Sequence, residues 1–194
     1  MSKRLFDLFF AFVGLIIASP LLIILFVLAS IDTKQNGLFF QKRIGQFGLP
    51  FTIYKIRTFG ISKKQPISKL GRFLRNSKLD ELPQLLNIII GNMSFVGPRP
   101  DIEGYYDLLV GENRKILELK PGLTSLASIK YSNEGYLLEN HENPFWYNDT
   151  VIFPDKVRMN LEYYNSNSII GDIKIIFKTL FNKNWTPRLK THLR

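Results

Sequence analysis

One long apolar segment near the N-terminus constrains the fold of this chain most. From Leu8 to Ala29 no side chain is charged, and as a straight helix the segment would extend about 33 Å, enough to cross the hydrocarbon core of a bilayer. A cleaved signal peptide has a shorter apolar region of roughly 7–15 residues, and Asp7 stands where such peptides carry positive charge. A buried helix of a soluble protein is disfavoured by the length and uniformity of the segment. We therefore expect residues 1–35 to insert into a membrane.

The flanks and the middle of this segment decide between a spanning and a re-entrant helix. Lys3 and Arg4 precede it and further lysine and arginine residues follow it. Basic flanks favour the cytoplasmic side, so a spanning helix would carry one of them outward. Pro20 lacks a backbone donor and biases Ser19 away from helical angles, while the Ser19 hydroxyl can bond the freed backbone groups. We predict a re-entrant helix–break–helix over residues 1–35, broken at Ser19 and Pro20, with Lys3 and Arg4 at the membrane interface.

The remaining residues, 36–194, are predicted to form one cytosolic catalytic domain that is continuous with the membrane segment. A chain of 194 residues is typical of a single domain. Hydrophobic periodicity predicts an α+β fold that is mostly helical with a few short strands. We expect strands at 38–41 and 51–58 and a short strand after the turn at 120–124. Helices are expected at 70–76, from about 80, at 101–119 with a break near Gly111, at 155–165 and at 169–181, and a loop at 131–150.

The charge of the chain points to an anionic partner. Its formal net charge is +10, which suits nucleic acid, a phosphorylated small molecule or an acidic membrane surface. It has no cysteine and only two histidines. Disulfide frameworks and cysteine-based zinc sites are therefore excluded, and a multi-histidine metal centre is disfavoured.

The adjacent acids Asp80 and Glu81 are the candidate catalytic residues. They precede Pro83, which is tolerated only in the first turn of a helix. Acidic residues often stand at helix starts for electrostatic reasons alone, but Arg75 and Arg99 flank this pair. A helix start among cations favours phosphate. One acid could attack phosphorus or hold a divalent ion while the other positions it, and Mg²⁺ with Asp80 as its ligand suits such a site.

Lys55 and Arg57 alternate along the strand expected at 51–58. Side chains two residues apart on a strand point to the same face, so they would form a row of two cations suited to phosphate oxygens. Without further context, a solvated strand face explains this pattern equally well.

The chain resembles the bacterial sugar transferases of the monotopic phosphoglycosyl transferase family, in their short form that contains only the catalytic core. The motifs that carry the resemblance are Lys3-Arg4-x-Phe6-Asp7, Ser19-Pro20, Gln41-Lys42-Arg43-Ile44-Gly45, Tyr54-Lys55-Ile56-Arg57-Thr58, Gly71-Arg72-Phe73-Leu74-Arg75, Leu79-Asp80-Glu81-Leu82-Pro83-Gln84-Leu85, Met93-Ser94-Phe95-Val96-Gly97-Pro98-Arg99-Pro100, Lys120-Pro121-Gly122-Leu123-Thr124 and Asp172-Ile173-Lys174-Ile175. The Asp-Glu-Leu-Pro-Gln segment followed at this spacing by Gly-Pro-Arg-Pro is highly specific.

This resemblance implies a transferase that starts the assembly of a bacterial glycan, such as a capsule, exopolysaccharide, O-antigen or glycoprotein glycan. Such an enzyme moves a sugar 1-phosphate from a UDP-sugar to a polyprenol phosphate, usually undecaprenyl phosphate, and releases UMP. It implies Asp80 as the nucleophile of an aspartyl phosphosugar intermediate, Glu81 as its partner, and Mg²⁺ to neutralise the pyrophosphate. The cations that would face phosphate or nucleotide are Lys55, Arg57, Arg75 and Arg99. The expected location is the cytoplasmic face of the bacterial inner membrane. The expected partners are the UDP-sugar, the polyprenol phosphate and the bilayer but not nucleic acid, and a homo-oligomer is left open.

Several positions depart from the pattern of the family. Lys78 stands where serine is usual, and Phe59 where methionine is common. Ser125, Ser128 and Asn160 also differ from the usual residues. None belongs to the acid pair, but the segment after Gly122 can affect the choice of sugar.

Two alternatives stay open at the level of the sequence. In the first, the same substrates react by direct attack of the lipid phosphate, with Asp80 or Glu81 as the base. In the second, the chain is a membrane-tethered basic module without enzymatic activity that binds nucleic acid or acidic lipid. The second alternative gives no reason for an acid pair inside a basic cluster.

Overall fold

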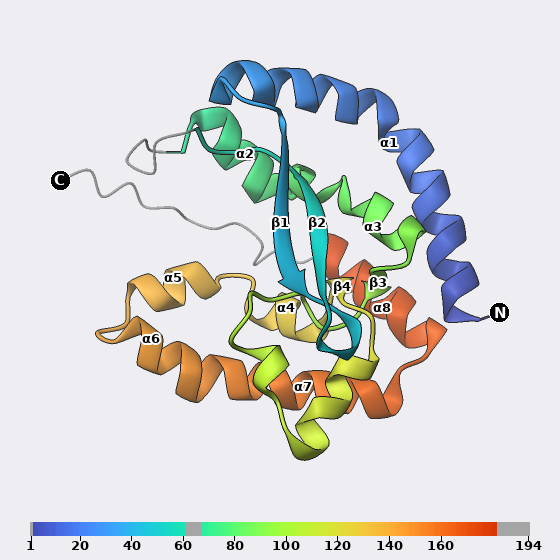
Figure 1. Cartoon of the computed structure of the whole chain (residues 1–194), viewed down its shortest axis with the longest axis vertical. Coiled ribbons are helices and arrows are strands. Elements are labelled where there is room, and N and C mark those ends of the chain that lie inside the picture. Colours follow the sequence, from blue (N-terminus) through green and yellow to red (C-terminus); the bar gives the residue numbers. More distant parts are fainter. Residues whose placement is uncertain (1, 61–66, 182–194) are drawn as a thin grey trace.

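The computed structural model describes residues 2–60 and 67–181, and it confirms a mostly helical α+β fold with few and short strands (Figure 1). The helices are α1 (Lys3–Thr33), α2 (Lys69–Ser77), α3 (Gln84–Ile90), α4 (Leu126–Lys130), α5 (Glu134–Glu139), α6 (Pro144–Tyr147), α7 (Phe153–Ser166) and α8 (Ile169–Leu180). The strands are β1 (Leu38–Ile44), β2 (Pro50–Ile56), β3 (Ser94–Val96) and β4 (Gly122–Thr124). Tight 3-10 turns occupy Gln46–Gly48, Leu79–Glu81, Tyr106–Leu108 and Gly111–Glu118, and a π turn occupies Asn148–Ile152.

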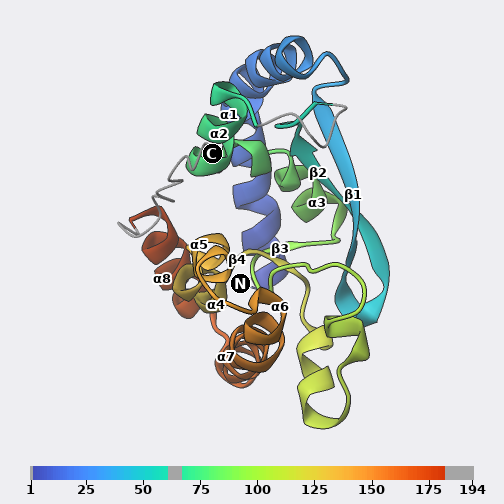
Figure 2. The same cartoon turned by 90° about the vertical axis from the view of Figure 1, so that its left-hand side faces the viewer.

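Helix α1 is one continuous helix of 31 residues that bends near its middle, where the sequence favours two helices separated by a break. Figures 1 and 2 both show it changing direction between its two halves. Pro20 cannot donate a hydrogen bond to the carbonyl of Ile16, four residues before it. The hydroxyl of Ser19 donates to that carbonyl instead, at 2.8 Å. The helix therefore passes through the proline with its freed acceptor satisfied, as the sequence led us to expect of Ser19.

The two ends of α1 are buried against the rest of the protein, but its middle is not. The buried residues of α1 are Phe6, Asp7, Ala11, Leu25, Ala29 and Thr33. No residue between Ala11 and Leu25 is buried, and Ile17 is 75% exposed. Within the described part of the chain, α1 alone is long and apolar enough to cross a membrane, with a mean hydropathy of 2.9 over its most apolar stretch. Because only 11% of that stretch is buried, α1 is not the core helix of a soluble protein.

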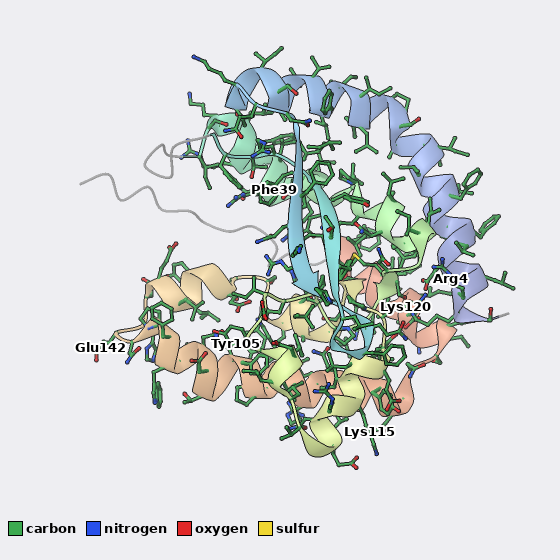
Figure 3. The ribbon with its side chains drawn as sticks, viewed as in Figure 1. Arg4, Phe39, Tyr105, Lys115, Lys120 and Glu142 are labelled. Carbon is green, nitrogen blue, oxygen red and sulfur yellow. The ribbon has the colours of Figure 1, made fainter. Side chains whose placement is uncertain are left out.

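Arg4 fixes the start of α1 to the end of α3. Its guanidinium donates to the carbonyls of Ile88, at 2.6 Å, and Ile89, at 3.0 Å. These are among the last carbonyls of α3, where the regular bonding within a helix comes to its end. Figure 3 shows Arg4 beside Lys120 at this end of α1. The charged group of Arg4, which we expected at the membrane interface, is thus bound to the protein.

Lys3 makes the same kind of contact with α8. Its ammonium group forms an ion pair with Asp172, whose side chain is only 1% exposed. Asp172 also accepts a hydrogen bond from the hydroxyl of Tyr163 on α7, at 2.6 Å. Here too a cation expected at the membrane interface holds α1 to the globular part of the molecule.

The other end of α1 is held by the segments that follow it. The hydroxyl of Ser30 accepts from the backbone amide of Gly37 at 2.9 Å, just before β1. Asp32 accepts from the hydroxyl of Ser68 at 2.6 Å, just before α2. Both ends of α1 therefore contact one and the same globular body.

The β1–β2 hairpin and α3 form the centre of that body. The strands are antiparallel, with Leu38 opposite Ile56 and Ile44 opposite Pro50. Asn87 of α3 is fully buried; it donates to a carbonyl of β2 at 2.7 Å and accepts from a β2 amide at 3.1 Å. The cluster beneath it consists of Ala11, Ile53, Leu85, Ile88 and Met93. This packing fixes the start of α3, and hence the acid pair before it, relative to β2.

The short parallel pair β3–β4 brings two glycine motifs together. Ser94 pairs with Gly122 and Val96 with Thr124. A Cβ atom on Gly97 would lie 2.2 Å from a backbone oxygen, and one on Gly122 would lie 2.1 Å from a backbone nitrogen of Gly97. Only glycine allows this approach, which sets the position of the Gly-Pro-Arg-Pro segment.

The second half of the chain differs from the sequence prediction in two places. The helix expected at 101–119 is replaced by two 3-10 turns. Gly111 adopts a positive φ angle of 59° at the place where a break was expected, and Gly104, with a φ of 103°, adds a second interruption that was not. The loop expected at 131–150 is mostly helical, as α5, α6 and the π turn. Asn143 caps α6 by accepting from the amide of Trp146 at 3.1 Å, with Pro144 at the first helical position. Helices α7 and α8 are confirmed.

Candidate active site

The acid pair lies in the 3-10 turn Leu79–Glu81 between α2 and α3, close to the expected helix start. Helix α2 ends at Lys78, whose left-handed backbone (φ 58°) turns the chain sharply. The turn then runs into Pro83, which directly precedes α3. Asp80 and Glu81 are each only 7% exposed. Two adjacent carboxyl groups are therefore held in a largely buried position.

Glu81 is held by two cations. Arg99 forms a close ion pair with one of its carboxylate oxygens and approaches the other at 3.4 Å. The ammonium of Lys55 lies 3.3 Å from the same carboxylate. Burial acts to raise the pKa of Glu81, but Arg99 and Lys55 outweigh it and hold that pKa far below its ordinary range. Glu81 is therefore ionised at any physiological pH.

Asp80 has the opposite character. Burial, and secondarily the charge of Glu81, raises its pKa from 3.8 to about 6. Its Oδ1 atom is buried without a hydrogen-bond partner among the described residues. Most buried polar atoms are paired, so a free carboxylate oxygen of this kind points to a functional role. Asp80 is ionised at neutral pH and has one oxygen free for a substrate or an ion.

Two cavities adjoin the pair. The first, called here the polar cavity, has a volume of about 350 Å³ and lies between Glu81 and Arg99 on one side and α4, α5 and α7 on the other. The second, called here the aromatic cavity, has a volume of about 380 Å³ and is lined by Asp80, Phe39 and Phe59. Both volumes are in the range of ligand pockets, about 300–1,000 Å³. The residues that line both cavities are Arg43, Lys55, Lys78 and Glu81.

Of the four cations that the sequence singled out, three reach the site. Lys55 and Arg99 bind Glu81 directly. Arg75 lines the aromatic cavity, where its Nε donates to the hydroxyl of Thr58 at 2.8 Å.

Arg57, the fourth cation, does not line either cavity. Its side chain donates to the backbone carbonyls of Asn36 at 2.7 Å and Leu38 at 3.3 Å. Its guanidinium also lies 5.3 Å from the centre of the Phe39 ring. Phe39 lies opposite Lys55 in the hairpin and lines the aromatic cavity, so Arg57 contacts a lining residue of that cavity without lining it itself.

Arg43 and Lys78 are site residues that sequence reasoning did not select. Arg43 lies on the same strand as Phe39, four residues away, and Phe39 is directly opposite Lys55 in the hairpin. The period of two along a strand was therefore the signal that could have placed Arg43 with Lys55. Lys78 belongs to the basic residues around the acid pair in the sequence and departs from the family pattern, but it was not selected as a site residue. Its backbone adopts the left-handed conformation, which is unusual for a lysine and is not predictable from the sequence. In this conformation Lys78 lines both cavities.

The donor set fits a magnesium ion only in part. Within residues 2–60 and 67–181, no group of three or more acidic, histidine or cysteine side chains could hold a metal. Glu81 is already paired with cations, which leaves the free oxygen of Asp80. Mg²⁺ commonly takes one or two carboxylates and completes its shell with water and substrate phosphates. The residues thus fit an ion that arrives with a phosphorylated substrate, and not a permanent metal centre.

The proteins to which this chain is similar are sugar transferases by name. A family model described as bacterial sugar transferase matches residues 1–184. A UDP-glucose:undecaprenyl-phosphate glucose-1-phosphate transferase of Klebsiella pneumoniae is 33% identical over 195 residues, covering 92% of this chain and 39% of that protein. A protein of the same name from Caulobacter vibrioides is 30% identical, covering 93% of this chain and 68% of the relative. The uncharacterized sugar transferase EpsL of Bacillus subtilis is 37% identical over 162 residues, covering 78% of this chain and 79% of EpsL. The chain thus spans less than half of the Klebsiella protein.

Proposed function

This chain belongs to the bacterial sugar transferase family, and from that premise we propose that it transfers a sugar 1-phosphate from a UDP-sugar to a polyprenol phosphate and releases UMP. The names of the Klebsiella and Caulobacter relatives support both substrate classes. The observation that carries the proposal is the buried acid pair, in which one carboxylate is neutralised by cations and the other has a free oxygen.

Asp80 is the nucleophile in this proposal. One of its carboxylate oxygens attacks the phosphorus that carries the sugar. The bond from that phosphorus to the bridging oxygen breaks, and UMP leaves with the oxygen and its electron pair. An oxygen of the polyprenol phosphate then attacks the same phosphorus, and the Asp80 carboxylate leaves in its original form. The covalent intermediate suits a site where a soluble nucleotide departs before a bulky lipid phosphate enters.

Glu81 positions cations in this proposal and does not react. A carboxylate whose pKa is held far below its usual range is a poor base. Its two ion pairs fix Arg99 and Lys55 beside the reacting phosphates, where they offset the charge that develops on the oxygens. The direct-attack alternative therefore rests on Asp80 alone as the base.

Magnesium is proposed as the cofactor, with Asp80 as its protein ligand. When bound, it would neutralise the pyrophosphate and make the UMP leaving group more stable. The cations of the site, Arg43, Lys55, Lys78 and Arg75, supply the rest of the positive charge around the phosphates. We expect removal of divalent ions by a chelator to abolish release of UMP.

We further propose that α1 enters and leaves the cytoplasmic leaflet of the inner membrane without crossing it. A helix that spans a bilayer has its ends on opposite faces, about 30 Å apart. Here both ends of α1 are fixed to one globular body, by Arg4 at the start and by Asp32 at the end. The bend at Pro20 and the unburied stretch between Ala11 and Leu25 support insertion of the middle of the helix.

Release of UMP from a panel of UDP-sugars tests the proposed activity. The full chain in lipid nanodiscs is given undecaprenyl phosphate and Mg²⁺, and UMP is measured with and without the lipid phosphate. We expect continuous release from at least one sugar nucleotide, and none from the Asp80→Asn variant. A folded Asp80→Asn variant with unchanged turnover would contradict both enzymatic mechanisms.

A further inference from the structure

The far wall of the polar cavity is not used by the proposed chemistry. This wall is formed by α4, α5 and α7, and its polar side chains include Ser128, Glu134, Lys156 and Asn160. In Figures 1 and 2, α5 and α7 lie at the end of the molecule away from the C-terminal half of α1. The wall therefore faces Glu81 and Arg99 across the cavity but lies apart from that half of the membrane helix.

An ion pair joins two helices of this wall. The ammonium of Lys156 on α7 lies 2.7 Å from both carboxylate oxygens of Glu134 on α5. The side chains are only 19% and 32% exposed. Glu134 is close enough to Arg99 to contribute to its raised pKa, after the larger effects of Glu81 and Asp80. The pair thus presents a fixed donor and a fixed acceptor to whatever occupies the cavity.

Hydroxyl and amide groups lie on the same wall. Ser125 and Ser128 share a hydrogen bond of 2.9 Å at the start of α4. Asn160, which is only 2% exposed, donates to the hydroxyl of Tyr106 at 2.9 Å. Short polar groups that are held by the protein in this way can discriminate between the positions of hydroxyl groups on a ligand.

The aromatic cavity has a different lining. The rings of Phe39 and Phe59 lie 5.1 Å apart between centres, and the guanidinium of Arg75 lies 5.7 Å from the centre of the Phe59 ring. Flat aromatic faces and an arginine suit a nucleobase and its phosphate. By its chemistry, the polar cavity suits the other end of a nucleotide sugar, which is a ring of hydroxyl groups.

We propose that the sugar ring of the UDP-sugar lies in the polar cavity, and that Glu134, Lys156 and Ser128 determine which sugar is accepted. The inference rests on the proposed function and adds the part of the site that selects the substrate. A site that hydrogen-bonds a substrate hydroxyl strongly rejects an analogue without it, because buried polar groups then lose their partners. A sugar that lacks or inverts one hydroxyl would leave the Glu134–Lys156 pair or the Ser128 hydroxyl without its hydrogen bond to the substrate.

The test compares variants of this wall over a sugar panel and measures nucleotide binding separately. Ser128→Ala, Glu134→Gln and Lys156→Met are assayed in nanodiscs with undecaprenyl phosphate, Mg²⁺ and the UDP derivatives of glucose, galactose, N-acetylglucosamine and N-acetylgalactosamine. The readouts are kcat/KM for each sugar and the inhibition constant of UMP. Glu162→Gln is the matched control, because it removes an exposed ion pair with Arg158 on the same helix α7.

We expect Glu134→Gln to change the ratio of kcat/KM between the best and the second sugar at least about tenfold, as the loss of one charged hydrogen bond implies. The inhibition constant of UMP should stay within about twofold of the parent, and the control should change neither. A weaker inhibition by UMP with unchanged ratios would place the nucleoside in the polar cavity and overturn the inference. Unchanged values for all three variants would overturn it as well.

The outcomes also separate this inference from the proposed function. If the parent releases UMP but the ratios do not respond, only the placement of the sugar fails. If the parent releases no UMP from any sugar of the panel, the proposed function fails and the inference falls with it. Ser128→Ala removes one hydroxyl at the start of a short helix, so it provides a result if the charge variants do not fold.

Discussion

Removal of the proposed nucleophile should make this protein more stable while it abolishes activity. Asp80 is buried, and its pKa rises from 3.8 to about 6 in the folded state. This difference corresponds to about 3 kcal/mol of destabilisation by the ionised carboxylate at pH 7.5. Asparagine has a similar shape without the charge, but its buried amide loses about 1 kcal/mol where partners are missing. We therefore expect Asp80→Asn to raise the free energy of unfolding at pH 7.5 by about 2 kcal/mol.

The stabilisation by Asp80→Asn should be present at neutral pH and disappear in acid. Above pH 6 the carboxylate is ionised in both the folded and the unfolded state, so its full cost is present. As the pH falls from about 6 to 3.8, the folded state takes up a proton before the unfolded state does. The cost then disappears. The difference in the free energy of unfolding between Asp80→Asn and the parent should therefore be largest near neutral pH and should be lost at about pH 4.

Thermal unfolding in identical detergent micelles, without nucleotide or divalent ions, measures this gain. For a chain of this size, about 2 kcal/mol shifts Tm upward by about 4–8 °C. Glu142→Gln is the control, because Glu142 lies exposed at the outer tip between α5 and α6 (Figure 3); its Tm should change by less than about 2 °C. An Asp80→Asn variant that melts at or below the temperature of the parent would refute the reasoning, as would a gain that persists at pH 4.

Three further results follow from the same contacts. The kcat/KM for a UDP-sugar should fall about tenfold per unit below pH 6, because Asp80 must be ionised to attack, and a flat profile from pH 5 to 7 would contradict this. Arg99→Met should lower kcat/KM at least about 100-fold, because it leaves the buried Glu81 carboxylate without its closest cation. Arg99→Lys keeps the charge and should lower kcat/KM less, and equal losses for the two variants would contradict a role for the positive charge. Lys3→Met should lower Tm by about 6–12 °C, because Asp172 stays buried without its cation at a cost of about 3 kcal/mol. Lys115→Met, at an exposed ion pair, should leave Tm within about 2 °C of the parent, and a Lys3→Met variant that melts like the parent would contradict the anchoring of α1 by Lys3.

The local features of the sequence predicted much of the fold. Apolar uniformity identified α1, and helical periodicity identified α2, α3, α7 and α8. Alternation identified β2, and the strand expected at 38–41 covers the first part of β1, but their pairing as a hairpin was not predicted. The acid pair was also identified, because carboxylates among cations before Pro83 are informative without any tertiary contact. The hydrogen bond from Ser19 to the carbonyl of Ile16 is a local consequence of Pro20 and was expected for that reason.

Long-range contacts were not predictable from one sequence. The cationic clamp on Glu81 depends on Arg99, which the approach of Gly97 to Gly122 places beside it. Arg57 shows the same limit, since its bonds to the backbone carbonyls of Asn36 and Leu38 keep it out of the lining of both cavities. Where a residue goes after its element ends is decided by packing, and not by local propensity.

The polar segment at 131–150 was misassigned for a different reason. Its asparagine and glutamate residues are typical of loops, but Asn143 with Pro144 is a helix start signal, and the structure uses it for α6. The result matters for function, because α5 carries Glu134 to the wall of the polar cavity. A loop at this position would not present a fixed ion pair to a ligand.

The central claim is that Asp80 forms a covalent bond to the sugar phosphate, and intact-protein mass spectrometry tests it most directly. The parent is incubated with the best UDP-sugar and Mg²⁺ in the absence of lipid phosphate, then acid-quenched and weighed. We predict an added mass of one sugar phosphate that maps to Asp80, is absent from Asp80→Asn, and disappears when undecaprenyl phosphate is added. A parent that turns over with lipid phosphate but never acquires this mass would contradict the covalent route and support direct attack.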